Sequence, residues 1–290
     1  MNGQRGVALV LVLAVTGVLA LLILQIGLTS RQQVAQAQAL VDRAEATLRL
    51  HSREAALLYS MLTRERNADP QSVAGDNVYA ANWNFRGDRF DVDGAAIRLQ
   101  NLGGLFPIPM PESSPREFTA LLMGLGVDPA RAEKTSRSLQ EAMSTPRRFP
   151  LQSITELGVV GELSDEEIDR VRDVATLYPV ATLNPATAPE AVLAVKYAGV
   201  ALEGLVAARR ESSLDEGRVR AIIGENWDDM MTTFLVGPGF RLDIAVEFRG
   251  VRLRRESVWT VRPSNEAAPL DLWSYRNLDY RSGEVFGVAR

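Results

Sequence analysis

Cysteine is absent from all 290 residues of the chain, and histidine occurs only once, as His51. Without cysteine there can be no disulfide, no thiolate metal site and no thiol nucleophile. A single histidine leaves no histidine cluster for a metal and no second candidate for the base of a catalytic triad. Gly-x-Ser-x-Gly motifs and Walker-type phosphate loops are missing too. We therefore expect the protein not to be an enzyme.

An excess of positive charge is also lacking, because 32 Lys and Arg residues stand against 36 Asp and Glu residues, a net charge of −4. Sequence-independent binding to nucleic acid requires a basic surface that neutralises phosphates. The charge balance therefore argues against a nucleic-acid partner.

Proline is missing before Pro70, and charged residues are missing from positions 7–28. At about 1.5 Å per residue, a helix over this apolar run is roughly 33 Å long, which is enough to cross a bilayer. Arg5 before the run and Arg31 after it give a weak charge asymmetry that favours a cytosolic N-terminus. Apolar or small residues then recur every three or four positions, so we expect the helix to continue unbroken to about Arg66.

A polar junction with a small residue stands directly before the apolar run. Gln4-Arg5-Gly6 precedes Val7, so a cut after Gly6 would leave the hydrophobic helix on the mature protein. An ordinary secretory signal is cut after its apolar segment, and residues 35–37 offer an Ala-x-Ala site for that. The run is longer than the usual signal core of about 7–15 residues. A cleaved signal peptide is therefore the alternative to a membrane anchor.

After the membrane run, the apolar positions of the long helix form a stripe that needs a partner surface. We assign six of them to contacts with helices of partner proteins and call them the partner-helix stripe: Val34, Val41, Ala44, Leu48, Leu58 and Leu62. Another side of this helix would cover the protein's own sheet. His51 falls on the apolar side, so we expect it to be a packed structural residue.

Two β regions are predicted, one on each side of a helical region. Residues 78–85, 89–92 and 96–99 are short aromatic or β-branched stretches separated by Gly and Asp, which is typical of small strands with tight turns. Residues 240–248 and 251–261 form the clearest hairpin, because apolar and polar residues alternate along the first of them.

The region between the β segments, from Pro115 to about Met231, is predicted to be all helical. Asp128-Pro129 marks one helix start. Capping boxes mark four more: Ser114 with Glu117, Ser153 with Glu156, Ser164 with Glu167, and Thr187 with Glu190. The expected fold class is α+β: a long N-terminal helix packed on a small antiparallel sheet, with an inserted all-α domain. The expected divisions are 1–6, 7–28, 29–111, 112–231 and 232–290.

The inserted domain contains a segment, Leu157-Gly-Val-Val-Gly161, that resembles the hairpin of a helix-hairpin-helix (SAM-like) module. In such a module the next helix offers free amides to a DNA phosphate. Here that helix begins among Glu162, Asp165, Glu166 and Glu167, whose carboxylates would repel a phosphate. We expect the module to serve packing, and a membrane-anchored DNA-binding protein stays open as an alternative.

Three carboxylates, Asp88, Asp91 and Asp93, lie near a predicted turn and are the ligand type that a hard cation such as calcium prefers. An EF-hand requires further oxygen ligands, and residues 95–97 supply none. We interpret the three as solvated turn residues and keep them only as weak candidates for a metal site. No cofactor is expected from the residues themselves.

Four segments together point to one family: residues 4–9, 149–157, 183–193 and 272–276. In this combination the chain resembles the K-type minor pseudopilins of type II secretion systems, the general secretion pathway protein K family. The first segment looks like a prepilin-peptidase site. The second and third resemble that family's motifs "pF.s..EL" and Asn-x-Asn-Thr-Ala-Pro, and the last resembles its closing strand. The resemblance implies a pilin-like fold and no enzymatic activity.

The resemblance also implies processing and a location. Prepilin peptidase would cut after Gly6 and methylate Val7, leaving a single-pass protein in the bacterial inner membrane with its bulk in the periplasm. Leu11 would then be the fifth mature residue, where most pilin-like proteins carry a Glu that pairs with the subunit ahead. A carboxylate in lipid is expensive without such a partner. Leu11 therefore fits a subunit at the pseudopilus tip, which has no subunit ahead of it.

The implied partners are the I-, J- and H-type minor pseudopilins, the major pseudopilin and the prepilin peptidase. The implied role is to help pseudopilus assembly and protein export across the outer membrane. Calcium binding is possible by resemblance only, and no ligand can be carried across. A minor pilin of a type IV pilus-like machine is the nearest alternative.

Overall fold

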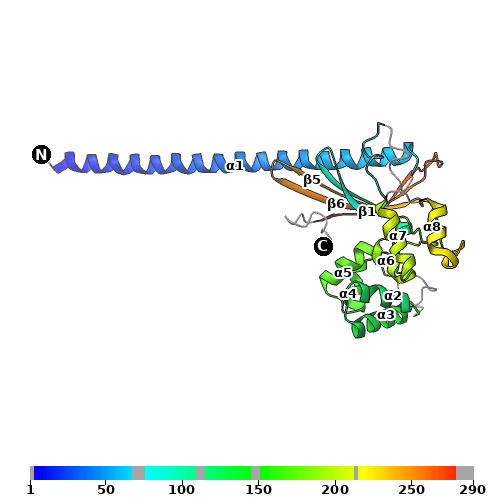
Figure 1. The fold of residues 1–290 in the computed structure, drawn as a ribbon. Coiled ribbons are helices and arrows are strands. Elements are labelled where there is room, and N and C mark those ends of the chain that lie inside the picture. Colours follow the sequence, from blue (N-terminus) through cyan, green and yellow to red (C-terminus); the bar gives the residue numbers. More distant parts are fainter. Residues whose placement is uncertain (1–2, 67–75, 109–114, 145–150, 212–214, 279–290) are drawn as a thin grey trace.

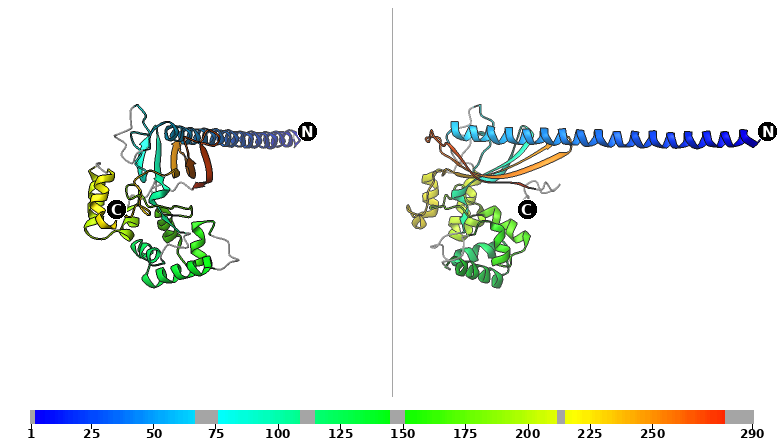
Figure 2. Two further views of the ribbon diagram at one scale, coloured as in Figure 1. Left: turned by 90° about the vertical axis from the view of Figure 1, so that its right-hand side faces the viewer. Right: turned by 180° about the vertical axis from the view of Figure 1, so that it is seen from behind.

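The computed structural model describes residues 3–66, 76–108, 115–144, 151–211 and 215–278, with side chains from Leu11 onward. A long helix, α1 (Gly3–Thr63), lies along one face of a five-stranded sheet and extends far beyond it (Figure 1). The remaining helices gather on the other side of the sheet, at the end of the head that is farthest from the N-terminus. Figure 2 shows the same separation from two further directions.

The sheet is antiparallel throughout, with the strand order β1-β2-β5-β6-β7. Its strands are β1 (Arg86–Val92), β2 (Ala95–Asn101), β5 (Gly239–Phe248), β6 (Val251–Val261) and β7 (Leu270–Leu278). Strands β2 and β5 are neighbours although the whole helical region separates them in the chain. The predicted α+β fold, with a long helix on an antiparallel sheet and helices in between, is confirmed.

The β1–β2 and β5–β6 hairpins both have two-residue turns. Asp93 and Gly94 have φ values of 50° and 77°, and Arg249 and Gly250 have φ values of 46° and 82°. Two successive positive φ values define a type I′ turn, whose twist matches that of the flanking strands, and glycine adopts the second position without strain. These turns fix the register of the β1–β2 and β5–β6 pairs.

The core of the head lies between α1 and the sheet. Leu50, Leu57 and Met61 of α1 are buried against a cluster that includes Phe85 and Phe240. The rings of the latter two are 5.5 Å apart. Burying large apolar side chains contributes roughly 1.5–3 kcal/mol each, so this cluster is the main attachment of α1 to the sheet.

The helical region has its own core, built on Leu121, Leu122, Leu157, Leu193 and Leu205. Its helices are α2 (Pro115–Gly124), α3 (Pro129–Ser144), α4 (Leu157–Val160), α5 (Asp165–Val174), α6 (Glu190–Lys196), α7 (Val200–Arg210) and α8 (Glu216–Ile223). Two 3-10 turns (Ile154–Glu156, Gly224–Asn226) and the short strand β4 (Ala175–Thr176) complete it. A third 3-10 turn (Leu102–Gly104) and the short strand β3 (Phe106–Pro107), which pairs in parallel with β4, precede it in the chain. We call residues 115–231 the insert. Its assignment as a helix-hairpin-helix or SAM-like domain stays a prediction.

Where the insert joins the head, two segments come unusually close. A Cβ atom on Gly104 would lie 2.3 Å from the carbonyl oxygen of Thr187, so only glycine fits there. Asn184, part of the motif at 183–193, donates from its side chain to the carbonyls of Phe234 and Leu235 at 3.1 and 3.0 Å. The motif therefore ties the insert to the segment that returns to β5.

Several local expectations need correction. Residues 78–85 are a turn followed by irregular chain, because Asn77 Oδ1 accepts hydrogen bonds from the amides of Tyr79 and Ala80. Helix α1 ends at Thr63 and does not reach Arg66.

Among the predicted helix starts, those at Asp128, Ser153 and Ser164 are confirmed by side-chain bonds to backbone amides. The expected cap at Thr187 is wrong, because α6 begins after Pro189, which makes no side-chain bond. Ser114 and the predicted boundary at 112 lie outside the described residues.

Candidate functional site

The free half of α1 is the most exposed apolar surface in the described residues. Every residue from 11 to 41 is exposed, and Leu11 keeps 66% of its surface accessible. From Leu11 onward α1 is long and apolar enough to cross a membrane, and none of its apolar window is buried in the protein. This is consistent with a single membrane span or with a signal sequence.

The predicted processing site lies at the start of the same helix. Gly6 and Val7 fall inside α1, which begins at Gly3, and the description of side chains begins only at Leu11. The cut after Gly6 stays a prediction.

The partner-helix stripe is divided between two environments. Val34, Val41 and Leu48 are 60–67% exposed, and Ala44 is exposed as well. Leu58 is buried and Leu62 packs on the core of the head. The three large exposed residues follow one another at intervals of seven, the spacing that keeps a seam towards one partner helix in a coiled coil.

A buried polar network fixes how α1 sits on the sheet. The Glu54 carboxylate accepts hydrogen bonds from Ser257 Oγ at 2.6 Å and from Trp259 Nε1 at 3.3 Å. It also pairs with Arg255 at 3.4 Å, and both side chains are only 10–12% exposed. A buried charge needs such partners, so only one placement of α1 along β6 satisfies it. Sequence reasoning missed this network, although Glu54 interrupts the buried series at 50, 57 and 61.

His51 lies beside this network but is exposed, with Nδ1 3.2 Å from Arg255 Nη1. The expectation that it is packed in an apolar environment is wrong. The apolar side of α1 that contacts the sheet is rotated away from His51.

The weak metal candidates Asp88, Asp91 and Asp93 do not converge. They pair with Arg86, Arg89 and Arg53, respectively, at 3.1, 2.8 and 2.9 Å. The described residues contain no group of three or more acidic, histidine or cysteine side chains that could hold a metal ion. Asp88 and Asp91 therefore form ion pairs along the edge strand β1, and Asp93 links the turn between β1 and β2 to α1.

The face of the sheet opposite α1 carries charge. One row crosses four strands, with Arg98 opposite Asp243, Asp243 opposite Glu256 and Glu256 opposite Arg276. Asp243 also accepts from Arg254 Nε at 2.9 Å, and Glu256 pairs with Arg276 at 2.8 Å.

The two acids of this row have pKa shifts in opposite directions. For Asp243, burial raises the pKa of the carboxyl, and the hydrogen bond from Arg254 does not fully offset it. For Glu256, burial also works against the charged form, but Arg241 and Arg276 outweigh it and lower the pKa.

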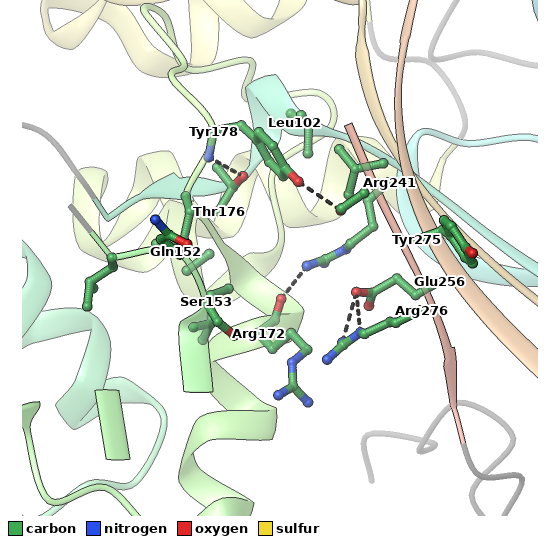
Figure 3. A pocket seen from close by; sticks show the side chains of 16 residues that line it. Leu102, Gln152, Ser153, Arg172, Thr176, Tyr178, Arg241, Glu256, Tyr275 and Arg276 are labelled. Carbon is green, nitrogen blue, oxygen red and sulfur yellow. Dashed lines mark hydrogen bonds and ion pairs between the residues drawn. The ribbon is translucent and has the colours of Figure 1, made fainter. Parts of the chain in front are cut away.

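A cavity of about 350 Å³ separates this charged face from the insert. Figure 3 shows Arg241, Glu256 and Arg276 on one wall and Ser153, Thr176 and Tyr178 on the other. Arg241 donates to the backbone carbonyls of Arg172 and Asp173 in α5. Tyr178 donates to Ser274 Oγ at 2.8 Å. The polar groups of this cavity therefore hold the insert against the sheet.

The start of α5, the candidate phosphate-binding position, is already occupied. Glu167 accepts from the backbone amide of Ser164 at 2.9 Å and pairs with Arg131. These hydrogen bonds, the one from the Ser164 amide above all, lower the pKa of Glu167 against the opposing effect of burial. A carboxylate of the protein itself thus takes the place that a phosphate would need.

A comparison with protein-family models gives no match, and neither does a comparison with the sequences of curated proteins. Among solved structures, the chain is similar to one in the crystal structure of the GspK-GspI-GspJ complex from the type 2 secretion system of enterotoxigenic Escherichia coli. The TM-score is 0.53 at 14% sequence identity, and the match covers 84% of this chain and 100% of the other. The fold is therefore pilin-like and resembles that of type II secretion pseudopilins.

Proposed function

We propose that the chain is a minor pseudopilin of a type II secretion system, of the general secretion pathway protein K type, with a structural and not an enzymatic role. The observation that carries the proposal is the division of α1, whose apolar first half is free while its second half packs on an antiparallel sheet. A protein built in this way presents one helix both to lipid and to neighbouring subunits.

The free half of α1 is proposed to be the membrane anchor. Prepilin peptidase would cut after Gly6 and methylate Val7, so that the apolar helix stays on a single-pass protein of the inner membrane. The N-terminus would face the cytoplasm and the head the periplasm. A tip position is proposed because Leu11, the fifth mature residue, offers no carboxylate to a subunit ahead.

The exposed members of the partner-helix stripe are the proposed contact with other subunits. Val34, Val41 and Leu48 lie outside the lipid-length run and keep more than half of their surface exposed. The similar solved structure is a complex of GspK with GspI and GspJ. By analogy, we propose the I- and J-type minor pseudopilins as the first partners, and the H-type and the major pseudopilin below them.

The position of the insert favours the tip. Its helices lie at the end of the head that is farthest from the N-terminus of α1 (Figure 1). A subunit adding above this one would meet α2 to α8 instead of a free helix surface. The insert would thereby end the pseudopilus and let assembly proceed only from below, in support of protein export across the outer membrane.

A nucleic-acid role has less support. The first turn of α5 contains Asp165, Glu166 and Glu167, and the last of these fills the amide site. A minor pilin of a type IV pilus-like machine shares the anchor and the helix, so the two roles are distinguished by their partners.

The mature N-terminus tests the anchor. Mass spectrometry of the protein purified from membranes should give methylated Val7 as the first residue. A first residue of Gln38 would instead indicate a cleaved signal peptide and remove the anchor.

Partner binding tests the stripe. The full chain in detergent should co-purify with I- and J-type pseudopilins, and the double variant Val41→Arg/Leu48→Arg should lose them because charge enters an apolar seam. Val159→Arg, at an insert residue that is 86% exposed, is the matched control. Retention of both partners by the double variant would disprove the assigned contact.

A further inference from the structure

Four distant segments meet in a groove at the junction of the head and the insert. They are the start of β1 with Arg98 of β2, the end of α5, the start of α6 and the end of α7. The groove has a volume of about 570 Å³ and is separate from the cavity in Figure 3. Its cationic residues, here called the groove arginines, are Arg86, Arg98, Arg170, Arg209 and Arg210.

The acids around the groove neutralise only some of the groove arginines. Asp88 pairs with Arg86 at 3.1 Å, and Asp173 lies 3.7 Å from Arg98. The third acid, Glu190, forms no ion pair with any residue that the structure describes. Five arginines against three carboxylates leave an excess of two positive charges, on a chain whose net charge is −4.

Arg209 has a buried donor without a partner. Its Nη2 donates to the carbonyl of Pro185, but the buried Nε has no hydrogen-bond partner among the described residues. Burial, followed by the charge of Arg86, lowers the pKa of this guanidinium to about 10. An unpaired buried donor beside a like charge is unfavourable, and an anion in the groove would relieve it.

Arg170 and Arg210 are free to meet such an anion. Both are exposed, and neither forms a hydrogen bond or an ion pair with a described residue. They come from different helices, α5 and α7, and line the same groove as Arg209. Three guanidinium groups without a carboxylate partner therefore surround one space.

The chemistry of the groove favours carboxylates of a protein over a nucleic acid. A guanidinium binds a carboxylate with two parallel hydrogen bonds, and an excess of two charges matches two acidic side chains. An extended phosphate backbone needs a longer basic surface, whereas this groove is interrupted by Asp88, Asp173 and Glu190.

We propose that the groove arginines form a binding site for an acidic segment of a partner protein, held by its side-chain carboxylates at Arg170, Arg209 and Arg210. The site goes beyond the role proposed for α1, because it uses neither the anchor nor the partner-helix stripe. It would give the junction of head and insert its own contact with a second protein.

The test measures binding of a fluorescent hexaglutamate peptide to the full chain in a neutral detergent. Low salt is used because exposed charges are screened over about 10 Å at 0.1 M. A hexaglutamine peptide should not bind. The double variant Arg170→Ala/Arg210→Ala, which removes no hydrogen bond or ion pair with a described residue, should raise the Kd about tenfold or more, since charge-assisted fork contacts are lost. The matched control Arg64→Ala, at an exposed arginine outside the groove, should change it less than about twofold.

Competition identifies the ligand class. Inorganic phosphate and a single-stranded oligonucleotide should each displace the peptide only at far higher concentration than unlabelled hexaglutamate. Stronger displacement by either would overturn the assignment to protein carboxylates. Equal binding of the two peptides, or an unchanged Kd in the double variant, would overturn the site itself. None of these results depends on whether the chain assembles with pseudopilins.

Discussion

The two faces of the sheet hold their neighbours in different ways. The face under α1 is apolar, with Phe240, Ile244 and Val246 of β5 in its core. The opposite face of the same strand is charged: Arg241 bonds to the insert, and Asp243 pairs with Arg254 of β6. One strand thus supplies an apolar attachment on one side and a charged attachment on the other, because successive side chains point to opposite faces.

The two attachments differ in how much they stabilise the fold and in what they depend on. Apolar burial is non-directional and contributes in proportion to area, so α1 is bound strongly along its packed half. Ion pairs and bonds to carbonyls depend on geometry and protonation. The attachment of the insert therefore depends on charged and polar groups, whereas that of α1 depends mainly on apolar contacts. Glu54 is the exception on the apolar face, where it sets the position of α1.

Neighbouring residues of β5 give the largest test of the comparison. Phe240→Ala should lower the free energy of unfolding by about 3–5 kcal/mol, because it leaves a cavity in place of a buried aromatic ring. Arg241→Ala, on the other face, should lower it by only about 1–3 kcal/mol through lost hydrogen bonds. Urea unfolding of the full chain in detergent, followed by circular dichroism, measures both. Equal losses would mean that the faces do not differ in strength.

Replacing Glu54 should cause the next largest loss of stability. Glu54→Ala should destabilise the head by about 3 kcal/mol, since the largely buried Arg255 side chain loses its carboxylate partner. Glu54→Gln keeps the shape and most hydrogen bonds, so it should cost less than Glu54→Ala. The same unfolding measurement applies. If both variants behave like the wild type, the network does not fix α1.

The smallest effect is a pH dependence on the charged face. Because the folded-state pKa of Glu256 is lowered, its contribution to stability is present above the unfolded pKa and is lost as pH falls through the folded pKa. The raised pKa of Asp243 acts in the opposite sense: its carboxyl is harder to ionise in the folded protein, so its contribution lowers stability as pH rises from the unfolded towards the folded pKa. The difference between wild type and Glu256→Gln isolates the first contribution.

Hydrogen exchange of the insert and of α1 between about pH 6 and pH 3.5 would measure that difference. We expect protection of α5 to fall in the wild type and to change less in Glu256→Gln, while the packed part of α1 stays protected in both. A larger loss in α1 than in α5 would reverse the comparison.

Features that depend on a few consecutive residues could be predicted from the sequence. Asp93-Gly94 and Arg249-Gly250 separate the paired strands, and in each the glycine adopts the second positive φ value of the turn without strain. The capping boxes at Ser153 and Ser164 predicted the helix starts there. The apolar run at residues 7–28 predicted the part of α1 that extends beyond the sheet. In each case a few consecutive residues contain the whole cause.

Features that depend on distant contacts could not be predicted in this way. Periodicity shows that α1 has apolar sides, but the sheet decides which of them is covered, so His51 was placed wrongly and Glu54 was overlooked. The aromatic residues around Trp83 resemble a strand, yet they belong to a turn and the irregular chain after it, whose side chains fill the core. The groove arginines come from segments separated by more than a hundred residues, and no local pattern connects them.

The attachment of α1 also has a mechanical consequence. The contacts from Leu50 to Met61, with Glu54 among them, are spread along the axis of one continuous rod. A pull along that axis loads them in shear, so they resist together, whereas a pull at right angles would peel them away one by one. Axial force applied at the far end of the rod would therefore reach the head almost undiminished. The molecule is built to be pushed or drawn lengthwise as a unit.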